Sequence, residues 1–184
     1  MPKLVETTLP NNNDPQGFIA PFLVRITEGI INTVAVTAHV SWILLTLIVI
    51  TNVILRYVFS NSIVAMEELQ WHLSSYAFMV GVAYCLVHDQ HVRVDVLAEH
   101  WPARRRAWID LIAMVALVIP FAYVVGTAAI PFVEFSHKLS ETSRSPGGLP
   151  YRWILKSVIP LAMGLLILAA FARALRMVAV IRKS

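Results

Sequence analysis

Histidine is the residue type in this chain with the widest chemical repertoire, and six histidines occur among 184 residues. Two of them, His39 and His72, lie well within apolar stretches, where a pair on different helices could hold a haem iron. At 1.5 Å rise per residue, His39 would lie about 12 Å from the inner edge of its span, and His72 about 5 Å from the outer edge of the next. The rings would differ in depth by roughly 10 Å or more in a core of about 30 Å, so haem bridging is disfavoured.

A second candidate site is the run 88–95, His-Asp-Gln-His-Val-Arg-Val-Asp, which contains four potential metal ligands. If this run is helical, His91 and Asp95 share a face at i, i+4. A zinc site generally needs three or four ligands with a second shell of support, and no cysteine stands nearby. We therefore interpret these residues as caps and ion pairs at helix ends, and we expect neither a metal nor another cofactor.

Signatures of catalysis or of independent transport are equally weak. No nucleophile–base pair, Walker loop or glycine-rich cofactor turn is recognisable, so we predict no enzyme activity. A stand-alone exporter would need an ionisable residue near the bilayer midplane, whereas the acidic residues near the apolar stretches lie at their ends: Glu67, Glu68, Asp110 and Glu134. Basic residues are not interleaved with aromatic residues as on a nucleic-acid surface, so we expect no nucleic-acid partner.

The elements that must position these residues are four apolar stretches. The chain is 58% hydrophobic and 14% charged, against about 45–50% and about 25% in soluble domains. Asp, Glu, Lys and Arg are absent from 29–55, 69–88, 111–133 and 157–172. About 20 apolar residues cross the hydrocarbon core, and the shorter fourth stretch can be extended if Arg173 and Arg176 snorkel to the headgroups. We predict an all-α integral membrane protein with four transmembrane helices, at about 30–56, 68–88, 108–134 and 152–176.

The N-terminal region differs in composition from the rest. Residues 1–17 are polar and rich in proline and asparagine, which predicts a flexible arm and not a secretory signal. Residues 18–27 are apolar apart from Arg25 and Thr27, a pattern compatible with an interfacial helix leading into the first span. We therefore divide the chain into an arm, 1–17, and a membrane domain, 18–184.

Basic residues indicate the orientation, because loops on the cytoplasmic side of a membrane carry an excess of Lys and Arg. Four spans place both termini on one side. If that side is cytoplasmic, ten basic residues lie inside, namely Lys3, Arg25, Arg93, Arg104, Arg105, Arg106, Arg173, Arg176, Arg182 and Lys183. Five lie outside, namely Arg56, Lys138, Arg144, Arg152 and Lys156. Both termini are therefore predicted to be cytoplasmic.

Several short motifs occur in order between residues 31 and 176. They are Asn52-Val53-x-x-Arg56-Tyr57-x-Phe59, Glu67-Glu68-Leu69, Phe78-x-x-Gly81, His91-Val92-Arg93-Val94-Asp95-Val96-Leu97, Ser145-Pro146, Leu149-Pro150 and Pro160. In these residues the chain resembles the small membrane (Q, DctQ-like) subunit of tripartite ATP-independent periplasmic (TRAP) transporters. The chain departs from the pattern at Ala65, where a tryptophan is usual, and at Ala162, where a glycine is common.

The resemblance implies a non-catalytic subunit of a sodium-driven transporter that imports an organic acid across the bacterial inner membrane. Its implied partners are a large multi-span subunit, which carries the substrate and sodium sites, and a periplasmic substrate-binding protein. The small subunit would scaffold the large one and contribute to docking of the binding protein. Two alternatives stay open, a membrane-anchor subunit of a redox complex and a stand-alone four-helix exporter.

Two sets of residues follow as site candidates. Polar residues of the predicted outer face are candidates for docking the binding protein by complementary charge: Arg56, Asn61, Lys138, Glu141, Arg144 and Arg152. Ordinary solvated or headgroup-facing charges are the alternative for each of them. Candidates for fixing the helix ends and their position among the membrane lipids are Glu67, Glu68, His91, Arg93, Asp95, Arg104, Arg105 and Arg106. We also expect Glu67 or Glu68 to pair with Arg56 across the short outer turn.

Overall fold

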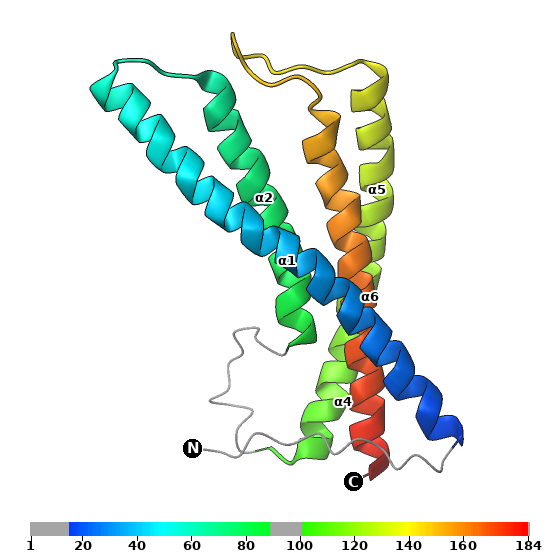
Figure 1. The fold of residues 1–184 in the computed structure, drawn as a ribbon. Coiled ribbons are helices and arrows are strands. Elements are labelled where there is room, and N and C mark those ends of the chain that lie inside the picture. Colours follow the sequence, from blue (N-terminus) through cyan, green and yellow to red (C-terminus); the bar gives the residue numbers. More distant parts are fainter. Residues whose placement is uncertain (1–14, 89–100, 184) are drawn as a thin grey trace.

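The computed structural model describes residues 15–88 and 101–183, and within them it contains helices and connections but no strand (Figure 1). The helices are α1 (Pro15–Val58), α2 (Val64–Val87), α4 (Ala103–Ala113), the π-helical segment η1 (Met114–Val118), α5 (Ile119–Lys138) and α6 (Trp153–Lys183). The segments α4, η1 and α5 follow one another without a break. The all-α prediction is confirmed for the described part of the chain.

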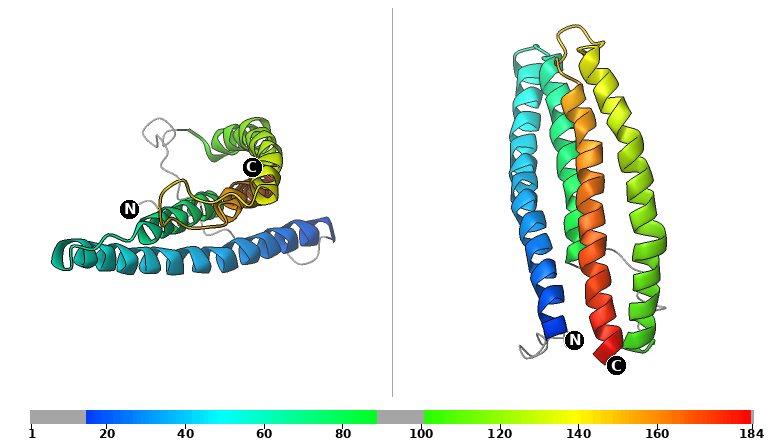
Figure 2. Two further views of the ribbon diagram at one scale, coloured as in Figure 1. Left: turned by 90° about the horizontal axis from the view of Figure 1, so that it is seen from above. Right: turned by 90° about the vertical axis from the view of Figure 1, so that its right-hand side faces the viewer.

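The helices form two antiparallel pairs, α1 with α2 and the α4–α5 rod with α6, and α2 packs on α6 between the pairs (Figures 1 and 2). The connections 59–63 and 139–152 lie at the same end, which we call the loop end (Figure 2). The beginning of α1 and the end of α6 lie at the opposite end, which we call the terminal end. This arrangement agrees with an even number of passes.

Three of the helical rods are long and apolar enough to cross a membrane, over Phe22–Val58, Arg104–Lys138 and Trp153–Arg182. Helix α2 is not one of them, although its 24 residues would measure about 36 Å. The reason lies in its first turns, where Glu67, Glu68, Gln70 and His72 lower the mean hydropathy. Of the predicted spans, three are therefore confirmed as candidates.

Helix α1 differs from the prediction, because its 44 residues run continuously from Pro15 to Val58. Residues 18–27, expected as a separate interfacial helix, are the first turns of this rod, and the expected arm loses 15–17 to it. Proline is well suited to the first turn of a helix, since the missing N–H would have no partner there. Residues 1–14 lie outside the described part of the chain.

The other helices also extend beyond the predicted limits. The third rod begins at Ala103 and ends at Lys138 instead of 108–134, and α6 continues to Lys183 instead of ending near 176. Charge-free runs mark only the part of a helix that matches the hydrocarbon core, whereas the backbone hydrogen bonds continue into the headgroup region. Arg and Lys do not stop them, because both are good helix formers.

The π turn η1 ends at Val118, two residues before Pro120. Proline has no N–H to donate to the carbonyl four residues earlier, so the regular α-helical pattern is interrupted there. The N–H of Ile119 instead donates to the Met114 carbonyl, five residues back, which is π-helical geometry. The chain thus remains helical through the position where proline removes one hydrogen bond.

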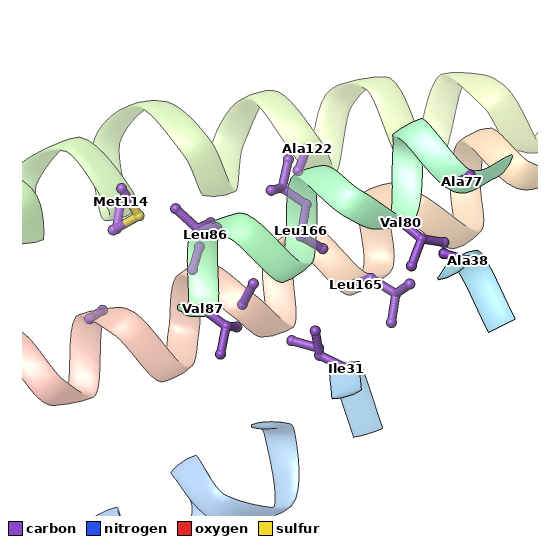
Figure 3. Close-up of a cluster of buried hydrophobic side chains, with 14 residues drawn as sticks. Ile31, Ala38, Ala77, Val80, Leu86, Val87, Met114, Ala122, Leu165 and Leu166 are labelled. Carbon is purple, nitrogen blue, oxygen red and sulfur yellow. The ribbon is translucent and has the colours of Figure 1, made fainter. Parts of the chain in front are cut away.

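The core is made mainly by small side chains of α2 and α6 (Figure 3). On α2, Ala77, Val80 and Ala83 are at most 1% exposed, and on α6 Ala169 and Ala170 are fully buried. Ile31 of α1 and Ala122 of α5 join the same cluster. Small residues allow helix backbones to approach closely, which favours packing where lipid supplies little hydrophobic drive.

Gly126 tests the packing of α5 on α6. A Cβ at this position would lie 3.1 Å from Cβ of Met163, whereas a Cβ at Gly164 would meet nothing within 4 Å. We expect Gly126→Leu to lower stability by about 1–3 kcal/mol through overpacking, measured as thermal unfolding in mild detergent. Gly164→Leu is the matched control and should unfold close to the wild-type temperature. Equal effects of the two substitutions would contradict the close α5–α6 contact.

Candidate functional site

The turn between α1 and α2 carries the first predicted pair. Arg56 Nη1 lies 3.8 Å from Glu67 Oε1, which confirms the expected pairing for Glu67 and not for Glu68. The Asn61 N–H donates to the Leu55 carbonyl at 3.0 Å and closes the end of α1. Because the side chains of Arg56 and Glu67 are 61% and 40% exposed, this ion pair contributes little stability. Arg56 is therefore accessible at the loop end.

Unlike Glu67, Glu68 binds the connection 139–152 through its carboxylate. One oxygen accepts the hydroxyl hydrogen of Ser143, and the other accepts the Leu149 N–H at 2.7 Å. A Cβ on Gly148 would lie 2.5 Å from Ser143 Cβ and 2.9 Å from Glu68 Oε1, so the close approach of Ser143 requires glycine here. Glu68 thereby joins the α1–α2 pair to the α5–α6 connection at the loop end.

Glu141 organises the beginning of that connection. Its Oε2 accepts the Ser136 hydroxyl at 2.7 Å and contacts the Lys156 ammonium, which lies 4.0 Å from the ring centroid of Phe132. Its N–H donates to the Ser136 carbonyl, and its carbonyl accepts the Arg152 N–H at 3.1 Å. The Lys156 and Ser136 hydrogen bonds hold the pKa of Glu141 below its ordinary value. This predicted docking residue is therefore turned inward and supports the loop.

The other docking candidates are distributed over the same end. Lys138 is 76% exposed and lies 3.7 Å from Glu134, one helical turn away. Asn61 and Arg144 are exposed and Arg152 is half-buried. Asn61 lies in the connection 59–63, Arg144 and Arg152 lie in the connection 139–152, and Lys138 is the last residue of α5.

The terminal end holds a cluster that the sequence analysis interpreted differently. Arg173, expected to snorkel to the headgroups, is only 3% exposed. Its guanidinium donates to the Leu86 carbonyl at 3.2 Å and to Asp110 Oδ2 at 3.0 Å. Arg176 donates to the Val87 carbonyl at 2.9 Å and pairs with Glu28 of α1. The two arginines thus contact all the other rods, and the expectation of snorkelling was wrong for Arg173.

A local signal for this burial was present in the sequence. Arg173 lies among Ala169, Ala170, Ala172 and Ala174, all at most 9% exposed. A run of alanines permits close helix contact on the face that carries them, which favours burial of an arginine on that face. The partners themselves could not be read locally, because Leu86 and Asp110 are far away in the chain.

The remaining predicted positions are less informative. His91, Arg93 and Asp95 lie outside the described residues. Arg104, Arg105 and Arg106 are exposed in the first turn of α4, which begins without a side-chain cap. Their predicted role in membrane positioning stays a prediction.

The histidines do not form a cofactor site among the described residues. His39 meets the Tyr84 ring edge-on at 5.8 Å, whereas His72 Nδ1 lies 2.7 Å from the carbonyl of Glu68. No group of three potential metal ligands occurs in the described ranges. Two shallow apolar grooves, of about 160 Å³ between α5 and α6 and about 150 Å³ between α2 and α6, are smaller than the roughly 300 Å³ of typical ligand pockets.

Comparison with known proteins points in one direction. The family described as "Tripartite ATP-independent periplasmic transporters, DctQ component" matches residues 45–180. A curated relative from Haemophilus influenzae, the "Putative TRAP transporter small permease protein", is 28% identical over 108 residues, which is 59% of this chain and 67% of the relative. No solved structure matches the chain significantly.

Arg173 provides a test of the terminal-end cluster. We expect Arg173→Met to lower stability by about 3 kcal/mol, because it leaves the Leu86 carbonyl without this donor and removes the guanidinium from Asp110. Thermal unfolding in detergent measures the effect. Arg182→Met, at an exposed position of the same helix end, is the control and should change stability little. An equal loss in both variants would show that Arg173 does not hold the rods together.

Glu141 provides a test by pH. A carboxyl group whose pKa is lowered on folding stabilises the folded loop above its ordinary pKa of 4.5. This contribution disappears as the pH falls below 4.5 through the lowered value. Hydrogen exchange of the peptide 136–141, corrected for the intrinsic pH dependence, should show protection that decreases in this window. In Glu141→Gln the protection should be weaker at neutral pH and less sensitive to acid; a wild-type response in this variant would rule out the role.

Proposed function

The chain belongs to the DctQ family of TRAP transporter components, which are transporter subunits and not enzymes, and we propose that it scaffolds a large membrane subunit and helps to dock a periplasmic binding protein. The docking proposal rests on one observation. At the loop end, Glu68 of α2 binds the connection 139–152. Basic side chains are exposed around it, namely Arg56 near the end of α1, Lys138 at the end of α5 and Arg144 in the connection. A fixed platform with exposed charge suits recognition of a soluble partner.

The proposed membrane arrangement has four spans in the bacterial inner membrane. Helix α2 packs along both α1 and α6, so it would cross the bilayer with them. Its length of about 36 Å is sufficient for a core of about 30 Å. The exposed Arg104, Arg105, Arg106 and Arg182 at the terminal end support a cytoplasmic location of both termini.

The proposed transport reaction is sodium-driven import of an organic acid. Resemblance to the family supports this proposal, and the sites for substrate and sodium are assigned to the large subunit. The middle of the three candidate spans carries no Asp, Glu, Lys or Arg, which agrees with a supporting role. The redox-anchor and stand-alone exporter alternatives have no geometric feature of the described residues in their favour.

Charge reversal tests the docking surface. We expect the combined variant Arg56→Glu, Lys138→Glu and Arg144→Glu to weaken binding of the cognate binding protein by about tenfold at low salt, with a smaller loss at high salt. Binding is measured on the purified complex of small and large subunits in nanodiscs. The variant Arg104→Glu, Arg105→Glu and Arg106→Glu, at the opposite end, is the matched control. Unchanged binding in the loop-end variant, or equal loss in both, would refute docking at this surface.

A further inference from the structure

A row of polar and aromatic residues, with one glycine among them, runs along the contact between α1 and α2. We call it the α1–α2 seam and define it by Asn32 and His39 of α1 and Gly81, Tyr84 and His88 of α2. The His88 Nε2–H donates to Asn32 Oδ1 at 2.8 Å, and the ring centroids of Tyr84 and His88 are 4.4 Å apart. His39 meets the Tyr84 ring at 5.8 Å, edge to face.

The helical repeat places these residues on one line. Asn32 and His39 are seven residues apart, which is close to two turns, so they share a face of α1. Gly81, Tyr84 and His88 are spaced at i, i+3 and i+7 and share a face of α2. Asn32, His39 and His88 are exposed, so this line lies on the surface of the described chain.

The seam is unusual for a surface that faces lipid. Exposed threonines of α1 satisfy their own hydroxyls, since Thr33, Thr46 and Thr51 each donate to the carbonyl four residues earlier. A histidine cannot satisfy both ring nitrogens in this way. Among the described residues, neither ring nitrogen of His39 has a hydrogen-bond partner. His39 lies about 26 Å from Arg56 along the helix, which places it inside the hydrocarbon region rather than at the loop-end headgroups.

Gly81 adds a notch beside these groups. A Cβ at this position would meet nothing within 4 Å, so no part of the described chain requires the glycine. Gly29 and Gly164 are equally open, but of the three only Gly81 belongs to the seam. Its backbone φ is not in the left-handed region either, so local conformation does not explain it. A small residue on a helix surface that is otherwise open permits the close approach of another helix. Gly81 also belongs to the Phe78-x-x-Gly81 motif, for which the fold of this chain alone gives no reason.

We propose that the α1–α2 seam is the surface on which a transmembrane helix of the large TRAP subunit packs, with its backbone close to Gly81 and a hydrogen-bonding side chain opposite His39. Lipid tails offer no hydrogen bond to an imidazole, whereas a polar side chain on a partner helix does. The inference rests on the proposed function, because it takes the large subunit as the partner. It adds which face of this chain meets that subunit.

A matched pair of glycine substitutions tests the seam. The tagged chain is co-expressed with its cognate large TRAP subunit and purified in mild detergent. Gly81→Leu should reduce the recovered large subunit by about tenfold, because the added side chain blocks the approach of the partner helix. Gly164→Leu adds the same side chain at another open position, on α6, and should leave recovery unchanged. Normal recovery with Gly81→Leu would overturn the proposal.

Cross-linking gives a second readout that does not depend on stability. His39→Cys is made with Cys85→Ser, which removes the only native cysteine. A short bifunctional maleimide should join position 39 to cysteines introduced along one transmembrane helix of the large subunit. Cross-linking only to a second copy of this chain, or to no protein, would overturn the assignment. If the wild-type chain itself recovers no large subunit, the proposed function fails, and this result is distinct from a loss confined to Gly81→Leu.

Discussion

The end of α2 near Val87 is the constraint on which the rest of the fold depends. The last carbonyls of a helix have no partner within it, and an end placed among other helices must find donors elsewhere. Arg173 and Arg176 of α6 supply them, and the same guanidiniums reach Asp110 of α4 and Glu28 of α1. A single helical turn of α6 therefore fixes the relative positions of all the rods at the terminal end.

Charge at both ends of α2 suits its dipole. Glu67 and Glu68 stand in or beside the first turn, where the positive end of the helix favours acidic groups, and the two arginines lie at its negative end. The charged groups at the two ends nevertheless bind different parts of the structure. The carboxylate of Glu68 holds a connection through hydroxyl and backbone donors, whereas the arginines hold neighbouring helices. Helix α2 is thus held by polar groups of its neighbours at both of its ends.

Sequence reasoning predicted the helical class, three of the spans and the pairing of Arg56 with Glu67 or Glu68, because each depends on local composition or on neighbours across a short turn. It did not predict the continuous α1, because loss of apolar character marks the membrane boundary and not the end of backbone hydrogen bonding. It missed the inward turn of Glu141 and the burial of Arg173. The latter depends on Leu86, 87 residues earlier in the chain, and no local pattern contains such a contact.

The π turn at Met114–Val118 has a consequence for the evolution of the third rod. A π turn holds one residue more than an α turn. The residues of α5 that continue a given face of α4 are therefore shifted by one position, or about 100°, from the regular α-helical pattern. Loss of one residue here would convert the segment into regular α-helix and leave the two halves in their present relative orientation, because the wider turn absorbs the extra residue. The segment is thus a site that can accommodate the insertion or deletion of a single residue. Such a change would preserve both the face that α5 presents to the membrane and the contacts of α4 with α6.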